Sequence, residues 1–354
     1  MQATSAPWPI HPSLREAWGD LYLNSRTATP FQSPDWVTSW WEVFGFGKEP
    51  KLLTIYEGGE LVAVYPLYRT FAPWRAIRVI GTGVSDYLGP LVRTGFEQPA
   101  AEALKAALDE LRKVDLVDLQ QLRQSSDLAQ SLELGNAASE ASCPVLRLPN
   151  DFESYVASLS KSLRYDVRKG LQGSVSVATA QTSSEALEFL QIFLDLHAAR
   201  WRKRGLPGAF GMPGVKRFHR EFVSRAVNAG VLRLSVAFSG EGQAIGALYA
   251  MQGGRATYFY QSGFAPEAKA LGPGTILIAH TIRQAIADGC EEFDFLRGDE
   301  PYKMRWNPQR IEPNVRYLQS TGAWRGRVGQ AVNRAEARVE ARIRARLEGK
   351  GLLK

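Results

Sequence analysis

Cysteine and histidine are scarce in this chain, which has two cysteines and four histidines among 354 residues. Cys143 and Cys290 show neither metal-ligand spacing nor a disulfide framework, so no metal site is expected and a reducing compartment is favoured. His197, His219 and His280 fall within expected helices and are interpreted as structural or surface residues. No run approaches 18 apolar residues, and the start lacks a basic segment followed by an apolar one. A cytoplasmic protein is expected.

Common catalytic signatures are also missing, because the chain has no Walker A, G-x-S-x-G or H-E-x-x-H pattern. Hydrophobic residues at 45% and charged residues at 22% are typical of a globular protein. The formal net charge of +7 points to an anionic partner without choosing among a nucleotide, a coenzyme, a nucleic acid and a membrane surface. A length of 354 residues predicts about two domains.

The first half of the chain has a mixed α/β pattern. Residues 51–69 predict a hairpin around a Gly-Gly turn, residues 97–113 have helical periodicity, and residues 114–122 return to an apolar strand. Residues 86–92 are interpreted as a further strand. The Ser- and Ala-rich segment 124–144 suits a connection, so we place a domain boundary near it.

The second half alternates helices with strands. Helices are expected over residues 151–170, 184–204, 215–229 and 274–288. Strands are expected over residues 175–180, 231–239, 243–252, 256–264 and 291–296. Gly-rich turns separate the three middle strands, as hairpin connections require.

The last thirty residues are basic and predict an amphipathic helix. An apolar stripe is formed by Val328, Val332, Ala335, Val339 and Ile343, with arginines beside it. The expected role of the stripe is to pack against the protein body, which leaves a solvated basic face. The alternative is peripheral contact with an anionic membrane surface or with a partner.

Residues 269–274, KALGPG, stand between an expected strand and an expected helix. The first N–H groups of a helix have no intrahelical partner and lie at the positive end of its dipole, so such an entrance can bind phosphate. Gly272 and Gly274 let a pyrophosphate approach the backbone, Pro273 stiffens the loop, and Lys269 adds a cation. The alternative is a Gly/Pro turn that only begins a helix.

Residues 293–305 place polar side chains directly after an apolar strand, where open α/β sheets bind ligands. Three carboxylates are candidates to accept a proton from an acceptor: Asp294, Asp299 and Glu300. Three more side chains are candidates to hold a phosphate or carboxylate on the acceptor: Tyr302, Lys303 and Arg305. Tyr302 is also a catalytic candidate. The alternative is that Asp294 forms a structural ion pair and the two cations are solvated.

Lys161, Arg164 and Arg168 recur at i, i+3 and i+7 of an expected helix, so their charges share one face. This face is either solvated or contacts an anion, such as a nucleotide-linked sugar or the phosphates of a donor.

The order strand, K-x-x-G-x-G, helix, strand resembles the coenzyme A pyrophosphate loop of the GNAT acyltransferase superfamily. The superfamily signature begins with Gln or Arg, where this chain has Lys269, and Pro273 stands in its middle. Residues 31–45, 85–91, 160–172 and above all 293–306 are similar to the CelD/BcsL branch, also called the BioF2-like acetyltransferase family. That branch is related to the FemABX peptidyltransferases.

The resemblance implies an α/β (α+β) fold of two tandem GNAT-like domains, each with a mixed, mostly antiparallel sheet flanked by helices. The expected domains are residues 1–145, a degenerate GNAT-like domain, residues 146–322, which bind acyl-CoA, and a basic helical tail over 323–354. It also implies acetyl-CoA or another acyl-CoA as donor, without a metal. The implied donor site contains Tyr260, Ser262, Lys269, Leu271, Gly272, Pro273, Gly274 and Thr275.

The resemblance further implies direct attack of an amine or hydroxyl on the thioester in a ternary complex. Branch membership suggests a small polar acceptor, such as an amino sugar or another precursor of the cell envelope or of an exopolysaccharide. Two alternatives stay open. The chain transfers an aminoacyl group from tRNA, as FemABX enzymes do, or it binds a sugar nucleotide or partner without catalysis. DNA binding is not expected, because the aromatics are not interleaved with the basic clusters.

Overall fold

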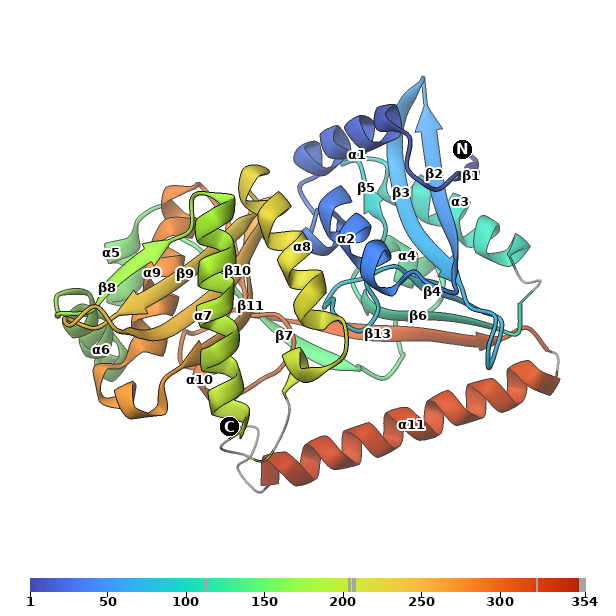
Figure 1. Ribbon diagram of the computed structural model, residues 1–354. Coiled ribbons are helices and arrows are strands. Elements are labelled where there is room, and N and C mark those ends of the chain that lie inside the picture. Colours follow the sequence, from blue (N-terminus) through green and yellow to red (C-terminus); the bar gives the residue numbers. More distant parts are fainter. Residues whose placement is uncertain (112–113, 203–204, 206–207, 323, 350–354) are drawn as a thin grey trace. The chain divides into compact units, whose positions relative to one another are not determined.

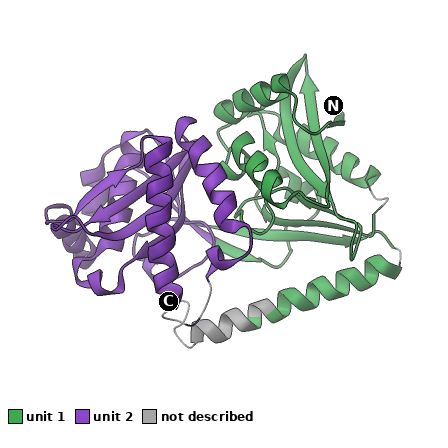
Figure 2. Ribbon diagram, in the orientation of Figure 1, with its two compact units in different colours: residues 1–142, 312–354 green, residues 143–311 purple. Residues whose placement is uncertain are grey.

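The chain divides into two units, drawn in separate colours in Figure 2. The computed structural model describes residues 1–111, 114–202, 205, 208–322 and 324–349. Unit 1 combines Met1–Ser142 with the chain from Glu312 onward, and unit 2 comprises Cys143–Ile311. The expected boundary near residue 145 lies close to this division. Residues 312–322 were expected in the second domain but belong to unit 1, because they pair there with a strand from the first half.

Unit 1 is built on a mixed sheet with the strand order β1-β2-β3-β4-β6-β13, and β5 pairs with β3. All described pairs are antiparallel except β4 with β6. Its strands are β1 (Ala3–Ala6), β2 (Glu49–Glu57), β3 (Glu60–Arg69), β4 (Ala76–Val79), β5 (Leu91–Val92), β6 (Leu116–Arg123) and β13 (Arg310–Ser320). Its helices are α1 (Pro12–Asn24), η1 (Pro30–Gln32), α2 (Pro34–Phe44), α3 (Glu97–Glu110), α4 (Asp127–Ser131) and α11 (Trp324–Gly349).

Strand β3 separates two apolar layers of unit 1. Ala63, Tyr65 and Leu67 are buried in a cluster with α3 and α4. Side chains alternate between the two faces of a strand, and Tyr68 accordingly packs against Trp40 of α2, with ring centroids 5.1 Å apart. The sheet of unit 1 is therefore covered on both faces, as Figure 1 shows.

The strands of unit 2 are also mixed and follow the order β7-β12-β11-β10-β9-β8. Only β11 and β12 are parallel among its described pairs. Its strands are β7 (Ala141–Arg147), β8 (Ser176–Thr179), β9 (Leu232–Phe238), β10 (Ala244–Gly253), β11 (Ala256–Phe264) and β12 (Glu292–Asp294). Its helices are α5 (Phe152–Ser158), α6 (Lys161–Leu171), α7 (Ser183–Arg202), η2 (Ala209–Gly211), α8 (Val215–Asn228), η3 (Pro266–Leu271), α9 (Pro273–Ala287) and α10 (Pro301–Met304).

Helices cover both faces of this sheet. The apolar faces of α5, α6 and α9 form one core with Phe259, Phe293 and Phe295 of the strand region. In Figure 1, α7 and α8 lie on the other face. There Phe193 of α7 packs edge-on against Tyr249 of β10, with centroids 5.9 Å apart. The strands of unit 2 are therefore buried on both sides.

Several expected elements are confirmed. The hairpin of β2 and β3 turns at Gly58 and Gly59, which have φ of 58° and 86°, values that a two-residue turn requires and glycine adopts readily. The expected ends of two helices, at residues 112–113 and 203–204, lie outside the described residues. Within the described ranges no helix is both long and apolar enough to cross a membrane.

Two expectations were wrong in detail, and one strand was missed. The helix expected over 151–170 is broken, because Ser160 caps a new helix by accepting a hydrogen bond from the backbone N–H of Leu163. Residues 86–90 form no strand, and only Leu91–Val92 pair. Strand β13 was not foreseen, since Pro313 within it argues against a strand.

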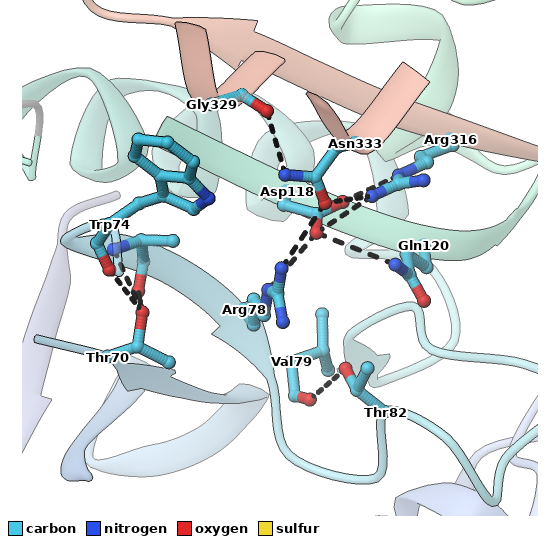
Figure 3. Close-up of polar contacts among 11 residues, drawn as sticks. Thr70, Trp74, Arg78, Val79, Thr82, Asp118, Gln120, Arg316, Gly329 and Asn333 are labelled. Atoms are coloured by element: carbon cyan, nitrogen blue, oxygen red, sulfur yellow. Dashed lines mark hydrogen bonds and ion pairs between the residues drawn. The ribbon is translucent and has the colours of Figure 1, made fainter. Parts of the chain in front are cut away.

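A buried carboxylate fixes the junction of β4, β6, β13 and α11 within unit 1 (Figure 3). The Asp118 side chain is fully buried, and its oxygens lie 3.1 Å from Arg78 Nε and 2.7 Å from Arg316 Nε. Asn333 of α11 adds an acceptor, since its Oδ1 lies 3.1 Å from a terminal nitrogen of Arg316. The opposite charges compensate one another, so burial of Asp118 is tolerated.

We expect Asp118→Ala to lower the free energy of unfolding by about 3–5 kcal/mol, because it leaves two arginines without their shared carboxylate in a buried place. Chemical denaturation measures this change. Asp20→Ala, at an exposed position of α1, is the matched control and should change stability by less than about 0.5 kcal/mol. Equal effects of the two substitutions would contradict the role given to Asp118.

Candidate active site

Strands β11 and β12 run side by side for a short distance and then separate. Their parallel pairing covers residues 256–258 of β11 and 292–294 of β12. Strand β12 stops there, while residues 259–264 of β11 continue beside β10 with no strand partner on the other side in the described part of the chain. Tyr260 and Ser262, expected at the donor site, are half-buried in this segment. Because backbone N–H and C=O groups need partners, this inner edge can bond to a ligand.

A β-bulge lies in the same segment of β11. Tyr249 of β10 pairs with Gln261, and the next residue, Ala250, pairs with Phe259. Tyr260 is therefore the extra residue of the bulge. Bulges bend a strand and redirect its side chains, and they are common next to active sites.

Helix α9 begins at the expected glycines. Gly272 has φ of 64°, in the left-handed region that glycine adopts without strain, and Pro273 occupies the first helical turn, where its missing N–H costs nothing. A Cβ added to Gly272 or Gly274 would meet no atom within 4 Å. The other expected donor residues in this loop are exposed or half-buried: Lys269, Leu271 and Thr275. The helix entrance is thus open to a ligand.

Two glycines in neighbouring elements hold the first turn of α9 in place. A Cβ on Gly246 of β10 would lie 3.0 Å from Pro273, and one on Gly170 of α6 would lie 2.6 Å from Ile276. These close approaches fix the helix entrance against the sheet and against α6. The unpaired N–H groups of the first turn, at the positive end of the dipole, then have a defined position in which to meet an anion.

The loop after β12 holds three carboxylates in different environments. Asp294 is only 2% exposed, and its Oδ1 accepts a hydrogen bond of 2.7 Å from the backbone N–H of Leu296. Leu296 has φ of 54°, which is unfavourable for leucine, so this bond supports a strained backbone. Asp299 is exposed. Glu300 is half-buried, and its Oε2 lies 3.0 Å from Nζ of Lys303.

Lys303 is buried, and its ammonium group is used within the loop. Nζ donates to the carbonyl oxygens of Arg297 at 2.6 Å and Gly298 at 3.2 Å, in addition to its ion pair with Glu300. An ammonium has three N–H donors, and two of them are engaged by these carbonyls. Lys303 shapes the loop that carries Glu300.

Tyr302 lies between this loop and β11. Its ring centroid is 6.4 Å from that of Phe259, close to the place where β11 leaves β12. The charges of Glu300 and of Arg200, in the last turn of α7, both act on the Tyr302 hydroxyl. Arg200 and the loop therefore both lie near the part of β11 that continues beyond the end of β12.

The expected basic face lies on α6. Lys161 and Arg168 are exposed, while Arg164 donates to a backbone carbonyl of the preceding turn. Arg305 pairs with Asp166 of the same helix at 3.1 Å, which links the loop after β12 to α6. Asp166 lies on the opposite side of α6 from these three basic residues, so the basic face is solvated and the loop contacts the helix elsewhere.

Residues 157–304 match the family model described as acetyltransferase (GNAT) domain. Unit 2 contains a GNAT acetyltransferase domain. The match includes the separation of β11 from β12 and the entrance of α9, and it supports N-acyltransferase activity for this domain. No curated protein matches the chain in sequence. Among the described residues, no group of three or more His, Cys, Asp or Glu side chains is arranged to hold a metal ion.

Solved structures share the fold at low sequence identity. FemX is 12% identical, with a TM-score of 0.65, covering 91% of this chain and 96% of its own. L-PGS from Bacillus licheniformis is 14% identical, with a TM-score of 0.51, covering 82% and 93%. A tandem GNAT protein from the clavulanic acid biosynthesis pathway is 13% identical, with a TM-score of 0.48, covering 91% and 99%. The expected α/β fold, with a mixed sheet flanked by helices, is confirmed.

Two of the motifs that carry the sequence resemblance meet outside the GNAT domain, around a cavity of about 190 Å³ within unit 1. Gln32 lines it and donates to the carbonyl oxygens of Gly89 and Pro90 at 3.0 and 2.7 Å. Arg123 lies over the ring of Tyr87, with its Cζ 4.1 Å from the ring centroid. Residues 31–45 and 85–91 therefore shape a hollow that sequence reasoning did not foresee.

A buried histidine, interpreted from the sequence as a structural or surface residue, lies beside the bulge of the GNAT domain. His219 of α8 is fully buried between two tyrosines, with Nδ1 3.3 Å from the Tyr249 hydroxyl and Nε2 3.5 Å from that of Tyr260. Burial lowers its pKa to about 3. Burial also lowers the pKa of His197 to about 4, with Arg200 adding to the shift. Both imidazoles are therefore neutral near pH 7.

This burial makes stability depend on pH. Below about pH 6.5 the unfolded chain protonates these histidines, while the folded chain does not until about pH 3 to 4. The free energy of unfolding should therefore fall with falling pH over that window, by up to about 1.4 kcal/mol per pH unit for each histidine. His219→Gln should reduce the slope of the free energy of unfolding against pH by up to about 1.4 kcal/mol per pH unit. Denaturation series between pH 6.5 and 4.5 measure this slope. The control His11→Gln, at an exposed position, should keep the wild-type slope. Equal slopes for the wild type and both variants would contradict the burial of a neutral His219.

Proposed function

We propose that this chain moves an acyl group from acyl-CoA to an amine, or a hydroxyl, of a small polar acceptor. The observation that carries the proposal is the open strand edge of β11 followed by the open entrance of α9, both inside the stretch that matches the GNAT family. An extended thioester arm needs unpaired backbone to bond to, and its pyrophosphate needs N–H donors without side chains in the way.

In this proposal the donor site is formed by two successive segments of the chain, strand β11 and the entrance of α9. Backbone groups of residues 259–262 bond to the pantetheine arm, with Tyr260 and Ser262 beside it. Gly274 and Thr275 present their N–H groups to the pyrophosphate, and Gly272, whose own N–H donates to the carbonyl oxygen of Lys269, lets the pyrophosphate approach the turn closely. Pro273 keeps the turn rigid, Leu271 contacts the apolar part of the coenzyme, and Lys269 supplies a positive charge.

The transfer requires four coordinated changes. A neutral nitrogen of the acceptor attacks the thioester carbon, and an unpaired backbone N–H of β11 stabilises the oxyanion. The carbon–sulfur bond then breaks, and the thiolate of CoA leaves. A carboxylate accepts the proton of the attacking nitrogen, and the thiolate is later protonated. Positioning both substrates in one complex provides much of the acceleration.

Glu300 is our choice for the proton acceptor. It is the half-buried carboxylate beside Tyr302, which contacts β11, whereas Asp294 supports the backbone of Leu296 and Asp299 lies in solvent. Tyr302 is placed to assist through its hydroxyl. Lys303 holds the loop that presents Glu300.

The acceptor in this proposal is an anionic or polyhydroxylated molecule, such as an amino sugar or another precursor of the cell envelope or of an exopolysaccharide. The basic face of α6, with Lys161, Arg164 and Arg168, supports an anionic group on the acceptor, and Arg305 adds a cation in the loop after β12. Resemblance to the CelD/BcsL branch supports the sugar class.

The donor assignment predicts that CoA or acetyl-CoA at about 100 times its dissociation constant stabilises the protein by roughly 2.7 kcal/mol in a thermal-shift assay. Gly274→Asp should abolish this shift, because the new carboxylate occupies and repels the phosphate site. Gly135→Asp is the matched control, since a Cβ there also meets no atom within 4 Å. A CoA shift retained in Gly274→Asp would contradict the assignment of the helix entrance.

The carboxylate assignment predicts three different results. Glu300→Gln should lower kcat roughly 10² to 10⁴-fold with little change in CoA binding, because it removes the proton acceptor but keeps the shape. Asp299→Asn should remain near wild type, and Asp294→Asn should chiefly lower the melting temperature. Steady-state kinetics with acetyl-CoA and an amino-sugar panel, together with melting curves, separate the three. A large loss of kcat in Asp299→Asn alone would transfer the role to that residue.

A second candidate function is transfer of an aminoacyl group from tRNA, and the likeness of fold to FemX favours it. An RNA donor would bind over a wide basic surface, so its affinity would fall steeply with salt. Incubation with acetyl-CoA in one arm and with charged tRNA in the other distinguishes the donors. Product from charged tRNA alone would replace acyl-CoA as the donor.

A further inference from the structure

Helix α11 attaches to unit 1 through a face of small residues. A Cβ added to Gly326 would lie 2.3 Å from the carbonyl oxygen of Asp115, and one added to Gly329 would lie 2.9 Å from Leu116. Asn333, four residues after Gly329, is buried and bonded to Arg316 (Figure 3). Only residues without large side chains permit this approach, so the attached face of the helix is fixed by these three positions.

The apolar stripe of α11 lies on the other side. Val328, Val332 and Val339 are 44%, 39% and 52% exposed, and Trp324 at the start of the helix is 73% exposed. At 3.6 residues per turn these positions stand roughly half a turn away from Gly326, Gly329 and Asn333. The expectation that the stripe packs against the protein body is therefore wrong for these described residues. A tryptophan and three valines face outward together.

Arginines border this outward face. Arg334, Arg338 and Arg342 are exposed and follow one another at intervals of four residues along one edge of the stripe. Over residues 324–349 the sequence has seven arginines and three glutamates. The outward face thus combines an apolar centre with a positive border.

We propose that this outward face of α11 binds an anionic lipid surface, with the helix lying in the plane of the interface. Apolar side chains with a tryptophan on one face, edged by arginines, are the features of interfacial helices that bind acidic lipids. Two copies of this helix placed face to face would bring their arginines together, which opposes self-association. A nucleic acid would pair with the arginines but leave the valines and Trp324 in water. An acidic lipid surface matches both parts of the face.

Sedimentation of the full chain with vesicles tests this proposal. Binding is expected to vesicles of equal parts phosphatidylglycerol and phosphatidylcholine and not to phosphatidylcholine alone. It should weaken at least fivefold on raising salt from about 0.1 M to about 1 M, where the screening length falls from about 10 Å to about 3 Å. Equal binding to both vesicle types, or binding to neither, would overturn the proposal.

Two paired variants locate the surface. Val332→Ser with Val339→Ser, and separately Arg334→Gln with Arg338→Gln, should each weaken binding to the anionic vesicles at least fivefold. These side chains are exposed, so the melting temperature should not change. Lys216→Gln with Arg217→Gln, exposed on α8, removes the same charge elsewhere and should leave vesicle binding unchanged. A dimer that dissociates in the valine variant without any vesicle binding would assign the face to a second copy instead.

Discussion

The open inner edge of strand β11 is the constraint on which this account rests. A strand inside a sheet normally satisfies its backbone groups on both sides, yet β12 ends at Asp294 while β11 continues to Phe264. The backbone that remains must bond to something else, and an extended ligand can provide the missing strand-like contacts. The function of unit 2 follows from a pairing that stops early.

The surrounding structure preserves this geometry. The bulge at Tyr260 redirects the strand where it loses its partner. The glycines at positions 246 and 170 let α9 approach the sheet and α6, which places its first turn beside the same segment. Asp294 at the end of β12 and Lys303 in the segment that follows both bond to the backbone of the loop between them. Rigid contacts of this kind let Glu300 and Tyr302 occupy defined positions, which proton transfer requires.

Local signals in the sequence predicted much of this. The Gly-Gly hairpin, the alternating strands and the KALGPG helix entrance depend on short-range chemistry, and each is present in the structure. The CelD/BcsL assignment goes beyond the comparisons and stays a prediction, as do the roles of individual site residues.

Long-range partners could not be read from the sequence. Strand β13 forms because β6 provides a partner, although Pro313 has no backbone N–H to donate and is disfavoured within a strand. The burial of Lys303 depends on two carbonyls that its own loop turns inward, and the pairing of His219 with two tyrosines joins three separate elements. The stripe of α11 was identified correctly, but its direction depends on the close approach that Gly326 and Gly329 allow.

Hydrogen–deuterium exchange of the full chain, with and without CoA, tests the central claim most directly. The account predicts that CoA slows exchange in peptides covering residues 259–262 and 272–276, because the ligand pairs the open edge of β11 and the first turn of α9. Peptides of unit 1 should change little. Protection confined to other peptides, or no protection by CoA at saturating concentration, would contradict the account.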